Sequence, residues 1–277
     1  MRIDAHQHFW KYSAEAYGWI TDEMPALKRD CLPADLKPLL EQAGFDGCVA
    51  VQARQSLEET DFLLDLAAKS SFIRAVVGWA DLQSAELEAT LERYQSRPLL
   101  KGIRHIVQDE PDDQFLLRPA FLKGIQALGR LGYTYDILVY ERHLPVVADF
   151  LQQSPEQPFV LDHLGKPEIA GPPSGRWQRG IRTIAQRPYV YCKLSGMVTE
   201  ADWNNWKPED FRPYLDTVLE AFGPERLMIG SDWPVCLLAA DSYGSVVQIV
   251  DEYISALSES EQAAIRGGTA AQFYQIS

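Results

Sequence analysis

Eight short apolar segments that suit β-strands alternate along this chain with amphipathic segments that suit helices, and this alternation constrains the fold more than any other feature. The expected strands cover residues 2–5, 47–52, 73–79, 100–105, 134–138, 159–162, 190–194 and 227–230. The expected helices cover residues 33–43, 57–68, 85–94, 119–131, 144–153, 177–186, 211–222, 245–257 and 259–273. Eight strands that are each followed by a helix predict an α/β fold of the (β/α)8 type, a TIM barrel.

The length of the chain fits one such domain. A (β/α)8 barrel typically has about 250 residues, so we expect a single barrel over residues 1–277. The alternative is an open, doubly wound sheet with helices on both faces. The chain has no Gly-x-Gly-x-x-Gly turn after its first strand and no Walker loop, which excludes the two commonest nucleotide-binding sites.

The charge of the chain limits its partners. Lys and Arg number 26 against 39 Asp and Glu, which gives a net charge of -13. This balance argues against nucleic acid or an anionic membrane as the partner, and the lack of an apolar run of about 18 residues predicts no transmembrane helix. Strand sequence begins at once, without a secretory signal, and the four cysteines form no Cys-x-x-Cys motif. We therefore expect a cytoplasmic protein that acts on a small molecule.

Two of the five histidines, His6 and His8, stand at the end of the first expected strand. Residues two apart on a strand point to the same face, so both imidazoles can aim at one place. Such a pair suits a metal site or acid/base chemistry, although a single His-x-His motif also arises by chance.

Polar residues gather at the carboxyl ends of the other expected strands, which is the end where TIM barrels hold their active sites. They are Gln52 and Arg54, Arg104 and His105, Tyr135 and Asp136, Asp162 and His163, Lys193, and Asp232 and Trp233. Each has a structural explanation when taken alone; for example, Arg104 could simply pair with Asp136. Their joint occurrence at one end of one barrel favours a catalytic cluster.

Long loops follow strands one, six and seven, and the loops after strands one and seven are rich in aromatic residues. These aromatic residues are Phe9, Trp10, Tyr12, Tyr17, Trp19, Trp203 and Trp206. All of these loops would lie on the same face of a barrel, where they could form the wall of a pocket for an organic substrate. The alternative is that they only pack the loops together.

Several segments of the chain resemble the amidohydrolase superfamily, and within it the sugar-lactone hydrolases of the L-fuconolactonase and L-rhamnonolactonase type. These segments are residues 4–10, 51–55, 102–105, 161–163, 193–196 and 230–234, and residues 107–111 are similar to L-fuconolactonase-like proteins in particular. The resemblance extends along essentially the whole chain. It implies a (β/α)8 barrel that hydrolyses L-fucono-lactone, or a related L-sugar 1,4- or 1,5-lactone, to the aldonic acid in sugar catabolism.

The resemblance also implies roles for the clustered residues. Asp232 would be the general base, which takes a proton from water and later returns it to the leaving oxygen. The lactone carbonyl would be polarised by a metal ion or by a cationic donor, for which the candidates are Arg104, Lys193 and protonated His163. The residues expected to bind sugar hydroxyls are Gln52, Arg54, His105, Asp136 and Trp233.

The chain departs from metal-dependent members of the superfamily in two places. Those proteins usually carry a histidine at strand five and often a bridging lysine or glutamate at strand four. This chain has Tyr135 and Asp136 at strand five, and Arg104 and His105 at strand four. The departures argue against a binuclear centre. They are compatible with one divalent ion, with zinc as the preferred candidate, held by His6, His8 and Asp232. They are equally compatible with a reaction that needs no metal.

Three other functions compete with sugar-lactone hydrolysis. Another lactonase, for muconolactone or a pyrone dicarboxylate, would need basic residues for its dianionic substrate, and Arg54, Arg104 and Lys193 are available. A related decarboxylase would use a metal and the aspartate of strand eight. A carbohydrate-binding protein without activity is disfavoured because the histidines and Asp232 are intact.

Overall fold

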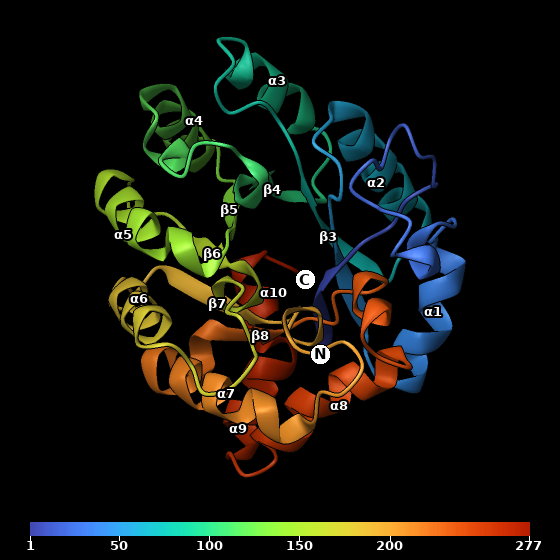
Figure 1. Cartoon of the computed structure of the whole chain (residues 1–277). Coiled ribbons are helices and arrows are strands. Elements are labelled where there is room, and N and C mark those ends of the chain that lie inside the picture. Colours follow the sequence, from blue (N-terminus) through green and yellow to red (C-terminus); the bar gives the residue numbers. More distant parts are fainter.

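Eight parallel strands lie side by side in the order in which they occur in the chain, from β1 to β8 (Figure 1). The computed structural model describes all residues, 1–277. The strands are β1 (Ile3–Gln7), β2 (Gly47–Val51), β3 (Ile73–Gly78), β4 (Leu100–Ile106), β5 (Thr134–Leu138), β6 (Phe159–Leu161), β7 (Val190–Leu194) and β8 (Leu227–Ile229). The predicted (β/α)8 barrel is confirmed, and strands β5 and β7 have the predicted bounds.

The two ends of the sheet meet at the carboxyl ends of β1 and β8. The backbone N–H of Asp232 donates to the carbonyl of His6 (2.8 Å), and the N–H of His8 donates to the carbonyl of Trp233 (2.7 Å). These bonds join the first residues of the barrel to the segment that follows its last strand. The closure therefore brings His6, His8 and Asp232 together from opposite ends of the chain.

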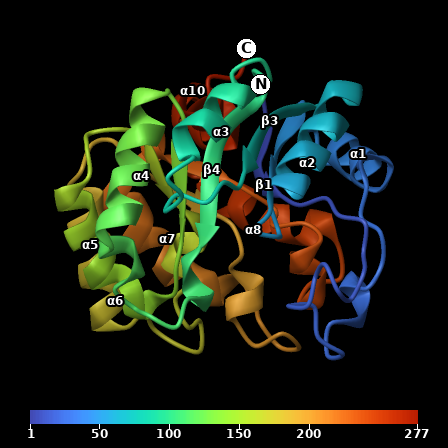
Figure 2. The same cartoon turned by 90° about the horizontal axis from the view of Figure 1, so that it is seen from above.

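Helices surround the ring of strands, as Figure 1 shows. They are α1 (Pro33–Gln42), α2 (Leu57–Lys69), α3 (Leu87–Tyr94), α4 (Pro119–Arg130), α5 (Leu144–Gln153), α6 (Gly175–Ala185), α7 (Pro208–Phe222), α8 (Tyr243–Ile254) and α9 (Glu259–Ala263), whereas α10 (Thr269–Phe273) lies at one end of the barrel (Figure 2). Ser56 and Ser258 cap α2 and α9 with their hydroxyls, as their spacing to glutamates predicts. None of the helices combines the length and the apolar character needed to cross a bilayer.

The last expected helix, residues 259–273, is not continuous. A π-helical turn, Ala264–Gly268, separates α9 from α10. The chain bends here because Gly267 lies directly against β1, and a Cβ at this position would stand 2.5 Å from the carbonyl oxygen of Met1. The bend leaves α10 beside the N-terminus, at the end of the barrel where the strands begin (Figure 2).

The apolar core has two parts. The larger part lies between strands and helices. The smaller part contains strand residues of mostly modest size together with residues from the C-terminal segment: Ile3, Ala5, Val49, Val51, Ala75, Val77, Val160, Met228, Ala270, Phe273 and Tyr274. Strands alternate their side chains between the two faces of a barrel, so this smaller cluster is the filling of the barrel interior. The C-terminal segment therefore closes one end of the barrel and leaves the other for the site.

Candidate active site

A cavity of about 380 Å³ opens at the carboxyl end of the strands. This volume falls within the ordinary range for small-molecule sites. Four residues expected to belong to the site line it: His8, Arg104, His163 and Asp232. The aromatic residues Trp19 and Trp203, from the long loops after β1 and β7, also line the cavity, as one of the two readings of these loops predicts.

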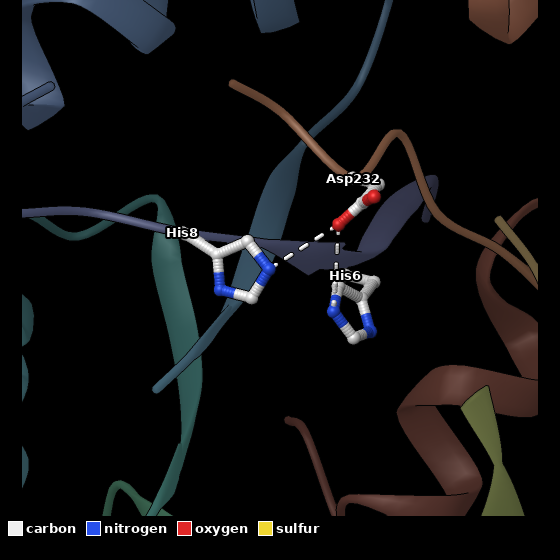
Figure 3. A group of neighbouring side chains, drawn as sticks. All are labelled: His6, His8 and Asp232. Carbon is white, nitrogen blue, oxygen red and sulfur yellow. Dashed lines mark hydrogen bonds and ion pairs between the residues drawn. The ribbon is translucent and has the colours of Figure 1, made fainter. Parts of the chain in front are cut away.

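His6, His8 and Asp232 form a buried group (Figure 3). Oδ1 of Asp232 lies 3.2 Å from Nε2 of His8 and 3.8 Å from Nε2 of His6. Asp232 itself has a left-handed backbone (φ 58°), a strained conformation of the kind found at functional sites. The predicted convergence of the His-x-His pair and the strand-eight aspartate is therefore present.

A hydrogen bond sets the tautomer of His8. Nδ1 of His8 lies 2.8 Å from the carbonyl oxygen of Val51, which can only accept, so this nitrogen carries a proton. His6 instead has a cationic donor at each ring nitrogen, since Nζ of Lys193 lies 3.2 Å from its Nδ1 and Arg104 lies 3.3 Å from its Nε2. Burial together with Lys193 lowers the pKa of His6 well below its usual value, which favours the neutral ring.

Asp232 has no Lys or Arg partner, unlike the nearby buried carboxylates Asp136 and Asp162. Burial alone would raise the pKa of Asp232, but His163, His8 and His6 outweigh it and hold the pKa below its ordinary value. No Lys or Arg nitrogen lies within 4.0 Å of it, although only 4% of the residue is exposed. A buried carboxylate beside the imidazole nitrogens of two histidines suits one divalent cation, and two nitrogens with one oxygen are a donor set that zinc accepts. The residues present therefore fit a zinc ion.

A second cluster lies beneath the first and is neutralised internally. Nζ of Lys193 contacts Oδ2 of Asp136 (2.6 Å) and Oδ1 of Asp162 (3.0 Å), and Arg104 donates to Oδ2 of Asp162 (3.1 Å). Burial acts to raise the pKa of Asp162, but Lys193, His6 and Arg104 outweigh it and keep that pKa well below its usual range. Arg104 also reaches Nε2 of His6 (3.3 Å), so the two clusters are in contact.

His163 is held in a conformation that two unusual backbone positions allow. Its own φ is 53°, and its Nδ1 lies 2.9 Å from the hydroxyl of Ser195. Gly196 (φ +62°) passes so close that a Cβ there would stand 2.4 Å from Nδ1 of His163. Burial lowers the pKa of His163 to about 4, with Asp232 opposing that shift. The expectation that protonated His163 polarises the carbonyl is corrected here, because this imidazole is neutral at neutral pH.

This buried histidine makes stability depend on pH. An unfolded histidine titrates near 6.5, whereas the pKa of His163 in the folded protein is about 4. Below pH 6.5 the unfolded chain gains a proton that the folded protein takes up only near pH 4. We expect the free energy of unfolding of metal-free protein to be highest above pH 6.5 and to fall, through this residue, by about 2 kcal/mol between pH 7 and pH 5. Urea unfolding at pH 7 and at pH 5 measures this fall in the free energy of unfolding. His163→Asn should remove that part of the loss, and an unchanged loss in the variant would contradict the assignment.

The structure places three residues expected to bind substrate away from the cavity. Arg54 donates to Glu58 and Ser56 at the start of α2. His105 stacks on Phe115 and bonds to Glu110, because neighbouring residues of a strand point to opposite faces and Arg104 is the one turned inward.

Trp233 is the third residue that does not reach the cavity, since it packs against Phe9 in the core. Gln52 and Asp136 are near the site but do not line the cavity either. Gln52 donates to the backbone carbonyl of Arg104. Asp136 lies on the buried side of Lys193, where burial raises its pKa and Lys193 opposes that shift. The expected contacts of these five residues with sugar hydroxyls are therefore not supported by their positions.

The cavity also contains polar residues that sequence reasoning did not select. Lys166 and Glu200 form an ion pair (3.3 Å) in its wall, and Trp19 Nε1 and Gln108 Oε1 are buried without hydrogen-bond partners. These four come from loops after β1, β4, β6 and β7. The available signal was their place in loops at the carboxyl end of the barrel rather than any motif.

Comparison with known proteins identifies the family of this chain. A sequence model of the family described as Amidohydrolase matches residues 3–276. An L-fucono-1,5-lactonase from Burkholderia multivorans is 45% identical, with 100% of this chain and 96% of that protein aligned. An L-fucono-1,5-lactonase from Burkholderia ambifaria is 38% identical, with 99% and 96% aligned.

A crystal structure of an amidohydrolase from Burkholderia multivorans with bound zinc has the same fold. It superimposes with a TM-score of 0.95 at 44% identity and covers 100% of both chains. The resemblance inferred from the motifs is confirmed. Because the family match and the alignments extend over nearly the whole length, this chain belongs to the amidohydrolase family.

Proposed function

We propose that this chain hydrolyses a sugar lactone, with L-fucono-1,5-lactone or a closely related L-sugar lactone as substrate and the aldonic acid as product. The observation that carries the proposal is the buried, ionised Asp232 in the wall of a small cavity, beside two histidines. The two lactonase relatives, aligned over nearly their full lengths, support this choice of substrate class. A neutral lactone needs no basic surface, so the net charge of -13 is no obstacle.

In this proposal Asp232 is the general base. Its Oδ1 faces the histidines, while Oδ2 takes part in neither contact and is available to accept a proton from water. The water oxygen adds to the lactone carbonyl, the bond to the ring oxygen breaks, and the proton on Asp232 passes to that oxygen. The product is an open-chain aldonic acid, which loses a proton to the solvent at neutral pH.

Arg104 is the cation placed to stabilise the carbonyl oxygen as it gains charge. It lines the cavity, whereas Lys193 does not. Its hydrogen bonds to Asp162 and to the carbonyl oxygen of Gln52 fix the guanidinium before substrate arrives, and donors fixed in advance stabilise a transition state most effectively. Lys193 then acts on the arrangement of the site rather than on the substrate.

One divalent cation, with zinc as the preferred candidate, would be held by His6, His8 and Asp232. Bound there, it would act as a Lewis acid on the lactone carbonyl. The unpaired charge of Asp232 favours this over the metal-independent alternative, and the relative crystallised with zinc supports it. His8 would be oriented by its bond to the carbonyl of Val51, a support that metal-binding histidines usually have.

The polar side chains of the cavity wall would bind the sugar hydroxyls. The amide of Gln108 can donate and accept, the ammonium of Lys166 can donate, and the carboxylate of Glu200 can accept. Trp19 lines the same cavity. These residues replace the five expected from the sequence. We further propose that residues 1–277 form one catalytic domain. Because all four cysteines are free and buried, we also propose a cytoplasmic setting.

A panel of lactones tests the proposed function. Acid release would be followed with a pH indicator in weak buffer, using L- and D-sugar lactones, muconolactone and a pyrone dicarboxylate. Each would be tried with metal-free and with zinc-loaded protein. We expect the fastest release on L-fucono-1,5-lactone or a configurational relative, and a lower rate after removal of metal. Release on no sugar lactone, or release of carbon dioxide from an aromatic acid instead, would overturn the proposal.

A further inference from the structure

The C-terminal segment places a tyrosine inside the barrel. Tyr274, which directly follows α10, is fully buried and packs with small residues of the strands, among them Ala5, Val49 and Ala75. The π-helical turn and the close approach of Gly267 to β1 direct the segment to this position. TIM barrels fill their interior with side chains from their own strands, so a tyrosine supplied from beyond the last strand calls for an explanation.

The hydroxyl of Tyr274 is bonded to a residue of the charged cluster. It donates to Oδ2 of Asp136 at 2.7 Å, and the same oxygen accepts from Nζ of Lys193 at 2.6 Å. The other oxygen of Asp136, Oδ1, is buried and has no partner. The orientation of this carboxylate therefore depends on two donors, of which Tyr274 is one.

Lys193 carries the contact onward to the site. Its ammonium lies 3.0 Å from Oδ1 of Asp162 and 3.2 Å from Nδ1 of His6, and His6 faces Asp232. The same ammonium stands 5.6 Å from the ring centre of Tyr274. Neither Tyr274 nor Asp136 lines the cavity, so neither can touch a substrate bound there.

We propose that Tyr274 is a positioning residue of the active site, whose hydroxyl orients Asp136 so that Lys193 is held against His6 and Asp162. Phenylalanine could fill the same space, so the hydroxyl is needed only for the bond to Asp136. Its loss would leave a buried carboxylate with Lys193 as its single donor. Networks of buried polar groups of this kind lose their unique geometry when one member is removed. The effect on turnover rests on the function proposed above.

Tyr274→Phe tests the role of the hydroxyl. We expect kcat to fall about tenfold, the size of one lost hydrogen bond to a charged group, while KM stays within about twofold because the cavity wall is untouched. Tyr133→Phe is the matched control, since its buried hydroxyl donates to the carbonyl of Leu91 and has no link to the site. It should retain the kcat of the wild type.

A double variant separates positioning from general destabilisation. In an Asp136→Ala background the acceptor of this hydrogen bond is gone, so adding Tyr274→Phe should lower kcat no further. If the two substitutions acted independently, the factors by which they lower kcat would instead multiply. Equal kcat values for Tyr274→Phe and Tyr133→Phe, or multiplied losses in the double variant, would overturn the proposal.

Zinc affinity gives a readout that needs no lactone. By chelator competition, Tyr274→Phe should bind zinc about tenfold more weakly than the wild type and Tyr133→Phe, because the groups behind a metal-binding histidine influence affinity by this order. Unchanged zinc affinity would contradict the positioning role. If the wild type hydrolysed no sugar lactone, the proposed function would fail, and zinc affinity would then decide the role of Tyr274 alone.

Discussion

Asp232→Asn is expected to lower kcat on the lactone substrate by about a thousandfold, in the middle of the range for loss of a general base. The amide has nearly the same shape but cannot take a proton from water and carries no negative charge. The left-handed backbone at this position (φ 58°) is one that asparagine tolerates, so the fold should persist. Initial rates and a thermal unfolding curve measure the two effects separately.

A surface aspartate provides the control for this variant. Asp216 accepts a bond from Tyr253 on the outer side of the barrel, so Asp216→Asn should turn over at the rate of the wild type. If Asp232→Asn kept more than about a tenth of the wild-type rate, the contribution of Asp232 would be below the usual range for a general base. Asp232 would then have another role.

Arg104→Met has the second-largest expected effect. Arg104 is buried, lines the cavity and is fixed by bonds to Asp162 and to the carbonyl of Gln52. Its removal takes away the cation assigned to the developing oxyanion and leaves Asp162 with Lys193 as its remaining cationic partner. We expect kcat/KM to fall by about 10² to 10³, the usual cost of one donor to an oxyanion.

Two further variants define the reason for that loss. Arg104→Lys keeps the charge but not the planar fork of donors, so it should recover only part of the rate. Arg97→Met removes an exposed pair with Asp65 and should leave kcat/KM unchanged. Full recovery by Arg104→Lys would mean that charge alone is required and that the fixed geometry of the guanidinium is not.

The sequence predicted the barrel because hydrophobic periodicity is a local property. Strands β5 and β7 have the bounds predicted from the sequence, and glycines such as Gly132 mark helix ends. The convergence of His6, His8 and Asp232 was also predictable, since the order of strands in a barrel fixes which ends become neighbours.

The parts that were missed depend on long-range contacts. His105 was expected in the site, yet strand alternation allows only one of Arg104 and His105 to point inward. Arg54 is drawn to Glu58 by the first turn of α2. The pair Gly267-Gly268 is a weak local signal of the break at the π-helical turn, but its cause, the packing of Gly267 against the N-terminal strand, is a long-range contact. The contact between Tyr274 and Asp136 follows from that break.

A single-turnover reaction in ¹⁸O-labelled water tests most directly the central claim, which is that water activated by Asp232 attacks the lactone carbonyl. Zinc-loaded enzyme in excess over L-fucono-1,5-lactone would be quenched after one turnover, and the product analysed by mass spectrometry. We expect one ¹⁸O atom in the carboxylate of the aldonic acid from the first turnover. A first-turnover product without the label would show that the oxygen came from an enzyme carboxylate, and would contradict the role of Asp232 as general base.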